Sequence, residues 1–342
     1  MTGKRVLVTG GTGFIGAHCI VRLLEAGFTV RTTVRTAARA ADVRAYVRAG
    51  GIESPEIECV TADLTHDDGW EAAVAGVDCV LHVASPFPTR EPKNPADVIE
   101  PSRSGALRVL RVSRDGGVRR VVLTSSFAAV GYSSRPDRPY TEADWTDPDD
   151  ARLTAYLRAK TLAERAAWDF VAAEGRGLEL ATVNPVLAFG PALGPELSTS
   201  VGLLRRLLTG KIPALPRSEL AAVDARDIAD LHVRAMEHPD AAGERFLAVS
   251  GDPITYQELA KLLKEQFGPR ARRVPTRTVP NGVLRLIARV DPELRAAASE
   301  LLTTHRVSSA KAQRVLGWRP RPRDEAILAS AESLFRLGLV PA

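Results

Sequence analysis

The residues best suited to chemistry are a tyrosine and a lysine four positions apart, Tyr156 and Lys160, in the stretch "AYLRAKTLAERAAW". This stretch lacks Gly and Pro and is rich in Ala, Leu, Arg and Glu, which predicts a helix. Residues four apart share one helix face, so the phenol and the ammonium should be neighbours. A phenol has an ordinary pKa of about 10, and a nearby cation lowers that pKa toward the range where a general acid works best. Taken alone, the pair fits equally well a half-buried Tyr beside a solvated Lys.

A glycine-rich turn follows the first predicted strand, in "RVLVTGGTGFIG". It contains the pattern Gly10-x-x-Gly13-x-x-Gly16 and leads into a predicted helix that begins with Phe14 and Ile15. Glycines permit the tight turn and let the N–H groups of a helix N-terminus approach a pyrophosphate. The position between strand and helix therefore predicts a dinucleotide-binding loop.

Two further positions bear on the adenosine half of a dinucleotide. Arg35 stands at the end of the second predicted strand, where a ribose-binding carboxylate is expected for NAD. A guanidinium there would pair with a 2′-phosphate instead, which predicts NADP(H), with Arg39 assisting. The alternative, that both are surface arginines, stays open. Asp63, which precedes Leu64 in "TADL", is placed either to reach the adenine amino group or to cap a helix.

The order of the predicted elements indicates an α/β fold. Short β-branched runs alternate with longer amphipathic runs, which predicts βαβ units and a doubly wound parallel sheet of the Rossmann type. The Pro- and Gly-rich segment "PVLAFGPALGPELSTS" breaks this alternation. We expect a dinucleotide-binding domain over 1–184 plus about 224–250. A smaller, discontinuous substrate lobe is expected over about 185–223 and 251–342, with 244–250 returning to the sheet.

Two predicted strands end in short motifs that face the same edge of the sheet. The fourth strand ends in "HVAS", with Val83, Ala84 and Ser85, and the fifth ends in "TSS", with Ser125 and Ser126. Open α/β folds bind ligands at the carboxyl ends of their parallel strands. The "TSS" motif is therefore a candidate part of a ligand site.

Taken together, these motifs resemble the short-chain dehydrogenase/reductases of the extended type. The matching pieces are "TGGTGFIG", "HVAS", "TSS", Tyr156-x-x-x-Lys160, "NPVLAFGP" and "VDARDIADLHVRAM". Within that family, "YTEADW" and "AKTLAERAAW" are most similar to the group of dihydroflavonol reductases, cinnamoyl-CoA reductases and bacterial aldehyde reductases. The resemblance spans nearly the whole chain, as far as "SSAKAQRVLGWRPR".

The resemblance implies a role for each candidate residue. Tyr156 would protonate a carbonyl oxygen as hydride leaves the nicotinamide, and Lys160 would lower the pKa of that phenol and hold the nicotinamide ribose. Ser126 would hydrogen-bond the substrate carbonyl, with Ser125 as the alternative if the register slips by one. Pro185, after the sixth strand, would lie near the nicotinamide carboxamide. The "HVAS" residues Val83, Ala84 and Ser85 would contact the cofactor as well.

The function predicted in this way is NADPH-dependent reduction of an aldehyde or ketone to an alcohol, on a moderately large apolar or aromatic substrate. Two alternatives remain: an NAD-dependent nucleotide-sugar epimerase or dehydratase, against which Arg35 counts, and a non-catalytic dinucleotide-sensing protein. The acid catalyst counts against the second alternative, since a sensor has no use for one. The expected substrate-lining residues are Phe87, Phe127, Tyr132 and Leu197.

Composition limits the other classes of function. The net charge of +5 is spread along the chain and only 5% of residues are aromatic, so we expect no nucleic-acid groove. No apolar run of about 18 residues and no secretion signal are apparent, so we expect a cytoplasmic protein without a membrane segment. The six histidines lack ligand-like spacing, which predicts no metal site. The expected partner is a small carbonyl compound, and a homodimer stays an open alternative.

Overall fold

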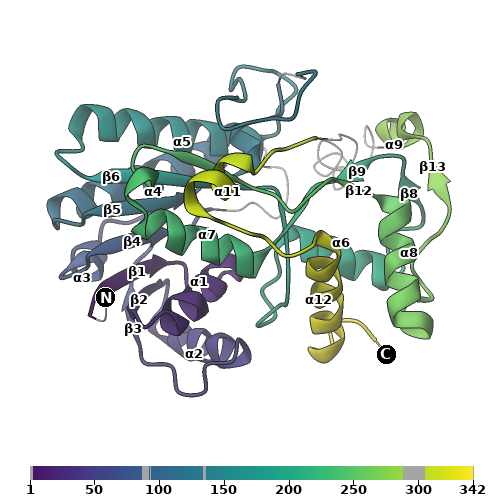
Figure 1. Cartoon of the computed structure of the whole chain (residues 1–342), viewed down its shortest axis with the longest axis horizontal. Helices are drawn as coiled ribbons and strands as arrows, with labels where there is room; N and C mark the ends of the chain where they lie inside the picture. The colour runs from purple at the N-terminus through teal and green to yellow at the C-terminus, as the bar shows by residue number, and fades with distance from the viewer. Residues whose placement is uncertain (1–2, 87–91, 93, 134–135, 288–304, 342) are drawn as a thin grey trace.

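A seven-stranded parallel sheet forms the larger part of the molecule (Figure 1). The computed structural model describes residues 3–86, 92, 94–133, 136–287 and 305–341. The strand order is β11-β6-β5-β4-β1-β2-β3, so the winding direction reverses between β1 and β4. The strands are β1 (Arg5–Thr9), β2 (Thr29–Val34), β3 (Ile57–Thr61), β4 (Cys79–His82), β5 (Arg120–Thr124), β6 (Glu179–Pro185) and β11 (Arg245–Ala248). The doubly wound Rossmann-type prediction is confirmed, and such a reversal point is where these folds bind ligands.

Helices cover both faces of the sheet (Figure 1). The two faces follow from the alternation of side chains along each strand: in β1, Val6 and Val8 pack in one core and Leu7 in the other. The first core is completed by α1 (Phe14–Glu25), α2 (Ala40–Ala49) and α7 (Ala225–Glu237). The second core is completed by α3 (Trp70–Val74), α4 (Ala96–Asp115) and α5 (Ala155–Glu174).

Strand β11 lies at one edge of the sheet and comes late in the chain. It pairs in parallel with β6, with Phe246 opposite Val183 and Ala248 opposite Pro185. Its four residues are all buried. Residues 245–248 thus form the last strand of the sheet, which the chain reaches after an excursion of about 60 residues that includes helix α6 (Thr199–Leu208) and several short strands.

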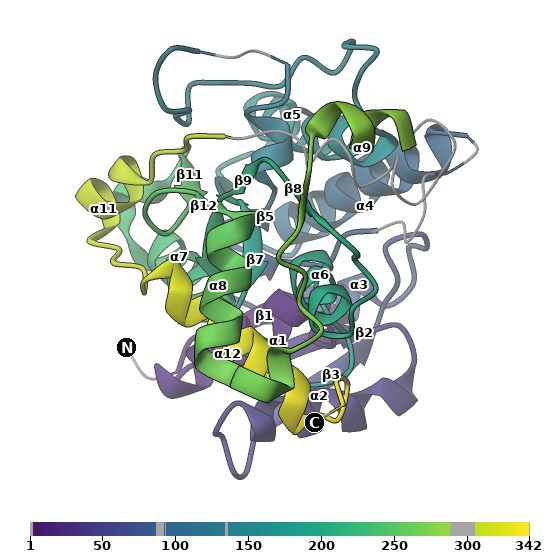
Figure 2. The same ribbon diagram turned by 90° about the vertical axis from the view of Figure 1, so that its right-hand side faces the viewer.

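A smaller lobe extends from the carboxyl ends of the strands and has its own apolar core (Figure 2). Its core residues lie on helices packed against one another, such as Leu204, Leu259 and Leu334. Within the described residues, the lobe's helices are α6 (Thr199–Leu208), α8 (Tyr256–Phe267), α9 (Asn281–Ile287) and α12 (Arg323–Arg336). Its short strands are β7 (Leu187–Phe189), β8 (Leu215–Pro216), β9 (Glu219–Leu220), β10 (Ala222–Asp224), β12 (Ile254–Thr255) and β13 (Thr278–Val279).

Short turns of 3-10 helix occur in both the sheet domain and the lobe. They are η1 (Ala37–Arg39), η2 (Phe127–Ala129), η3 (Pro239–Ala241) and η4 (Gly268–Ala271).

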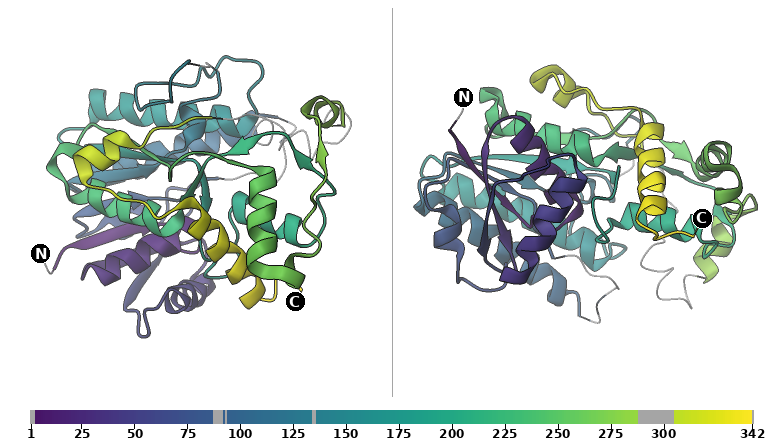
Figure 3. Two further views of the ribbon diagram at one scale, coloured as in Figure 1. Left: turned by 45° about the vertical axis from the view of Figure 1, so that its right-hand side comes forward. Right: turned by 90° about the horizontal axis from the view of Figure 1, so that it is seen from below.

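The C-terminal segment crosses back to the sheet before it reaches the lobe (Figure 3). Helix α11 (Ala310–Leu316) packs against β11 and α7, and Trp318 is fully buried in the sheet's first core. The Trp318 indole N–H donates to the Asp227 carbonyl at 2.9 Å. The predicted boundary at residue 251 assigned this segment to the lobe. The sheet domain and the lobe therefore exchange the chain more often than composition suggests.

Among the described residues, every helix is too short or too polar to cross a bilayer.

Candidate active site

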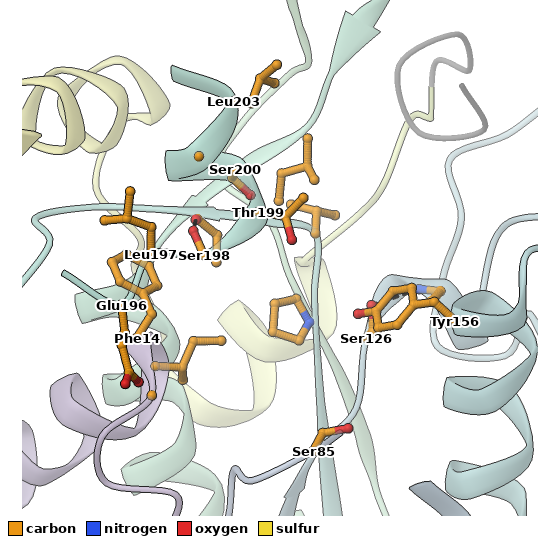
Figure 4. A pocket seen from close by; sticks show the side chains of 18 of the residues that line it. Phe14, Ser85, Ser126, Tyr156, Glu196, Leu197, Ser198, Thr199, Ser200 and Leu203 are labelled. Atoms are coloured by element: carbon orange, nitrogen blue, oxygen red, sulfur yellow. Dashed lines mark hydrogen bonds between the residues drawn. The ribbon is translucent and has the colours of Figure 1, made fainter. Parts of the chain in front are cut away.

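A large pocket, of about 1510 Å³, runs along the carboxyl ends of the strands and into the smaller lobe. Figure 4 shows Tyr156 and Ser126 toward one end of this pocket and Phe14, Glu196 and Leu197 toward the other. Phe87 lies outside the described residues. The predicted site residues that line the pocket are Gly10, Gly13, Phe14, Ile15, Gly16, Arg35, Asp63, Leu64, Val83, Ala84, Ser85, Ser126, Phe127, Tyr132, Tyr156, Lys160, Pro185 and Leu197.

The glycine loop presents an open helix N-terminus to the pocket. Gly10 has φ +74°, which favours glycine, and a Cβ on Gly16 would lie 2.3 Å from the Gly10 carbonyl oxygen. The N-cap of α1 is Gly13, and no side chain caps the helix. The first backbone N–H groups of this 12-residue helix can therefore bind an anion. The close approach of Gly16 to the Gly10 carbonyl leaves no space for a side chain at Gly16. These features fit the pyrophosphate of a dinucleotide.

Asp63 sits at the expected adenine end but is engaged locally. Its Oδ1 accepts hydrogen bonds from the Thr65 backbone N–H at 2.8 Å and the Thr65 hydroxyl at 2.6 Å. These two bonds lower the pKa of Asp63, and the charge of Arg35 adds to the effect. Helix α3 begins at Trp70 with Gly69 as its N-cap, so Asp63 caps a turn and not that helix. Its side chain still lines the pocket.

The two predicted phosphate-binding arginines differ in their surroundings. Arg35 is exposed and lines the pocket. Arg39 forms ion pairs with Asp42, at 2.8 Å, and with Glu196 from the segment between β7 and α6. Arg39 is thus already neutralised by two carboxylates, which leaves Arg35 as the better candidate for a 2′-phosphate.

The end of β4 is fixed by one buried hydroxyl. The Thr9 Oγ1 accepts hydrogen bonds from the backbone N–H groups of Val83 and Ala84, both at 3.0 Å. Since both acceptor positions of this oxygen are used, its proton goes to His82 Nδ1, 2.8 Å away. A Cβ on Gly10 would lie 3.0 Å from the Ala84 Cβ. The "HVAS" segment and the glycine loop are therefore packed directly against each other.

The structure distinguishes the two serines that follow β5. The Ser125 hydroxyl is buried and donates to the Glu164 carboxylate. The Ser126 Oγ accepts from the Ala128 N–H at 3.1 Å, which leaves its proton available to another acceptor. Ser126 is partly exposed and points into the pocket near Tyr156 (Figure 4). This geometry favours Ser126 over Ser125 as the carbonyl-binding serine.

Tyr156 and Lys160 lie in the first two turns of α5, whose N-terminus is capped by Thr154. Both side chains line the pocket. The Lys160 Nζ donates to the Thr124 carbonyl at 3.4 Å, at the end of β5. Burial lowers the pKa of Lys160 to about 8, and the nearby Glu164 carboxylate opposes that shift. The pKa of this ammonium thus lies below that of an ordinary surface lysine.

The end of the pocket that holds Ser126 contains an aromatic cluster that motifs alone did not reveal. The ring of Phe127 packs on Tyr132, Tyr140 and His305, with ring centroids 5.7, 5.4 and 5.0 Å away. His305 comes from the C-terminal segment and lines the pocket, although no local pattern marks it. The other lining residues missed in the sequence come mainly from the lobe and include Leu203, Ile212, Leu220 and Tyr256.

Comparison with known proteins identifies the family. Residues 6–248 match the model of the NAD dependent epimerase/dehydratase family. The cinnamoyl-CoA reductase CAD2 of Medicago truncatula is 34% identical over 78% of this chain and 81% of its own length. The dihydroflavonol 4-reductase of Zea mays is 34% identical over 77% of this chain and 74% of its own length. The yeast methylglyoxal/isovaleraldehyde reductase Gre2, solved in complex with NADPH, superposes with a TM-score of 0.78 at 25% identity and covers 98% of this chain and 99% of its own.

The chain therefore belongs to the NAD dependent epimerase/dehydratase family. Its relatives are reductases, so it stands among the oxidoreductases of that family. The predicted resemblance to the extended short-chain dehydrogenase/reductases, and to the dihydroflavonol and cinnamoyl-CoA reductase group within them, is confirmed.

Proposed function

We propose that this protein reduces an aldehyde or ketone to an alcohol with NADPH, and that Tyr156 is the general acid. The observation that carries the proposal is that Ser126, Tyr156 and Lys160 line the same pocket as the glycine loop. The relatives named as reductases, and the NADPH complex of the similar Gre2 structure, support this choice.

Each side chain has a distinct task in this reaction. The bound dinucleotide supplies the hydride. The Tyr156 hydroxyl donates its proton to the carbonyl oxygen, and the Ser126 hydroxyl donates a hydrogen bond to the same oxygen, which stabilises developing negative charge. The Lys160 ammonium favours the phenolate left behind, so it lowers the pKa of Tyr156 toward neutral pH.

The walls of the substrate end favour an apolar or aromatic carbonyl compound. Phe127, Tyr132 and His305 form one side, and the lobe contributes Leu203 and Leu220. Rings and branched apolar side chains bind such groups through burial and ring stacking. A panel of aromatic and aliphatic aldehydes and ketones, assayed by loss of NADPH absorbance, tests the proposal. Absence of turnover with every member of a broad panel would reject it.

Cofactor choice should depend on Arg35. A guanidinium beside a 2′-phosphate forms charge-assisted hydrogen bonds that contribute roughly 1.5–3 kcal/mol each. We therefore expect NADPH to be preferred over NADH by about one to two orders of magnitude in kcat/KM. Arg35→Asp should erase or reverse that preference, because it repels the phosphate and offers the ribose an acceptor.

The control for this prediction is Arg48→Asp, the same change of charge on the exposed end of α2. It should leave the cofactor ratio unchanged at a fixed ionic strength. Equal use of NADH by the wild type, or an unchanged ratio in Arg35→Asp, would mean that Arg35 does not bind the phosphate.

Lys160→Ala should weaken turnover and cofactor binding together, because one ammonium serves both the phenol and the nicotinamide ribose. Loss of hydrogen bonds to a charged group, about 1.5–3 kcal/mol, should raise the Kd for NADPH by about one to two orders of magnitude. Fluorescence titration of NADPH measures this effect, with Lys261→Ala on the exposed face of α8 as the control. A normal Kd with reduced kcat would limit Lys160 to the phenol.

A further inference from the structure

A buried carboxylate, Glu164, lies beneath the candidate catalytic residues and has no part in the reaction described so far. It stands on α5, one helical turn after Lys160, and its side chain is fully buried. Four groups donate hydrogen bonds to it: the Arg245 Nε at 2.7 Å, the Asn184 amide at 2.7 Å, the Trp168 indole at 3.4 Å and the Ser125 hydroxyl. The Thr182 hydroxyl, 3.2 Å away, shares its one proton between Glu164 and the Asn184 Oδ1 at 3.0 Å.

Two of these donors belong to the strand ends that form the site. Ser125 immediately precedes Ser126 on the chain, so its bond to Glu164 fixes the backbone from which the Ser126 hydroxyl projects. Asn184 precedes Pro185 at the end of β6, and its amide also donates to the Ser126 carbonyl at 3.2 Å. One carboxylate thus ties the ends of β5 and β6 to the helix that carries the tyrosine and lysine.

Arg245 supplies the positive charge that a buried carboxylate requires. Its guanidinium is itself buried, donates to the carbonyls of Glu142 at 2.6 Å and Asp144 at 2.9 Å, and lies 3.7 Å from the centre of the Trp145 ring. The arginine is therefore held on several sides. Glu164 can keep its negative charge without solvent.

We propose that Glu164 is a positioning residue of the reduction: it orients Ser126 and keeps a negative charge one turn from Lys160, so that the ammonium stays protonated beside Tyr156. This inference rests on the proposed carbonyl reduction. It gives the family's Tyr/Lys pair a buried counter-charge in this chain.

Among the residues that the structure describes, few titratable groups face Lys160. On its own helix these are Glu164 and the Tyr156 phenol. From the sheet, the neutral Thr124 carbonyl accepts a hydrogen bond from the Lys160 ammonium. His82, at the end of β4, is held neutral, since burial and then the charge of Lys160 lower the pKa of His82 to about 3. Burial lowers the pKa of Lys160 to about 8, while Glu164 raises it. Removing the carboxylate charge must therefore lower the Lys160 pKa further.

The test is Glu164→Gln in the full-length protein, which keeps the shape and removes the charge. A neighbouring opposite charge shifts a pKa by about one unit or more, a change of about tenfold in proton binding. We expect the fall of kcat at alkaline pH, centred near pH 8 in the wild type, to move down by about one unit. NADPH affinity at acid pH should change little. Glu164→Asp, which restores the charge, should return the pH profile toward that of the wild type.

A second readout needs no turnover. In protein with carbon-labelled lysine side chains, the Lys160 resonance, assigned through Lys160→Arg, reports its pKa directly by NMR. The matched control is Glu179→Gln, because Glu179 pairs at 2.7 Å with the buried Arg120 at the opposite ends of the same two strands. That variant should leave the titration of Lys160 and the pH profile unchanged. If Glu164→Gln fails to fold, the double variant Glu164→Gln/Arg245→Gln removes both charges and should show the same lowered titration.

The outcomes separate the two proposals. An unchanged Lys160 titration and an unchanged kcat profile in Glu164→Gln, or equal shifts in Glu179→Gln, would overturn the role of Glu164. A lowered Lys160 pKa in a protein whose wild type reduces no carbonyl would support the electrostatic coupling and reject the proposed reduction.

Discussion

Replacing Tyr156 with Phe should reduce the rate of carbonyl reduction on the order of 10²–10⁴-fold, the usual share of general acid catalysis. The change removes the proton donor but keeps the ring on α5, so the fold and the pocket should persist. NADPH affinity should stay within a few-fold of the wild type, because the glycine loop and Arg35 are untouched. Steady-state kcat and a binding titration with NADPH measure the two effects separately.

A hydroxyl removed elsewhere provides the control. Tyr140 packs on Phe127 at 5.4 Å but is absent from the pocket lining, so Tyr140→Phe should retain most activity. Parental turnover in Tyr156→Phe, with the fold intact by circular dichroism, would require another acid. Equal losses in the two variants would indicate general damage to the pocket.

Ser126→Ala should lower kcat by about two to three orders of magnitude while leaving the Kd for NADPH nearly unchanged. Removal of one donor to a developing oxyanion typically costs about 2.7–4 kcal/mol of transition-state stabilisation. The Ser126 oxygen accepts from the Ala128 N–H through one lone pair, and its proton can be donated separately to a carbonyl in the pocket. Single-turnover rates with saturating NADPH measure the effect on the chemical step.

The neighbouring serine provides the comparison. Ser125 donates to buried Glu164 and does not offer its proton to the pocket. Ser125→Ala should therefore reduce kcat less than Ser126→Ala does. A larger loss in Ser125→Ala would contradict the assignment of the carbonyl-binding hydroxyl to Ser126.

Much of the sheet domain could be predicted because its signals are local. The strand, glycine turn and helix around Gly13 are contiguous in the chain, and the spacing of Tyr156 and Lys160 is set by one helical turn. The parallel sheet follows from strands alternating with helices, and even β11 was recognisable from its apolar run.

The features that escaped prediction join distant segments. His305 meets Phe127 across 178 positions of sequence, and Arg39 meets Glu196 across 157. Neither contact leaves a pattern in the residues around it. Ser125 and Ser126 both line the pocket, and which of their hydroxyls is engaged by Glu164 depends on side-chain direction at a strand end, which spacing does not reveal. The packing of Trp318 in the sheet's core was also not predicted, because the Pro and Arg residues that flank it are typical of exposed loops.

The most direct test of the proposed reaction follows the hydride itself. NADPH deuterated at the transferring position of the nicotinamide is incubated with the wild-type protein and an aromatic aldehyde, and the product is examined by mass spectrometry. The proposal predicts one deuterium on the carbinol carbon of the alcohol, formed in step with NADP⁺ and lost almost entirely in Tyr156→Phe. Alcohol without deuterium, or deuterated NADPH left unoxidised across the carbonyl panel, would contradict it.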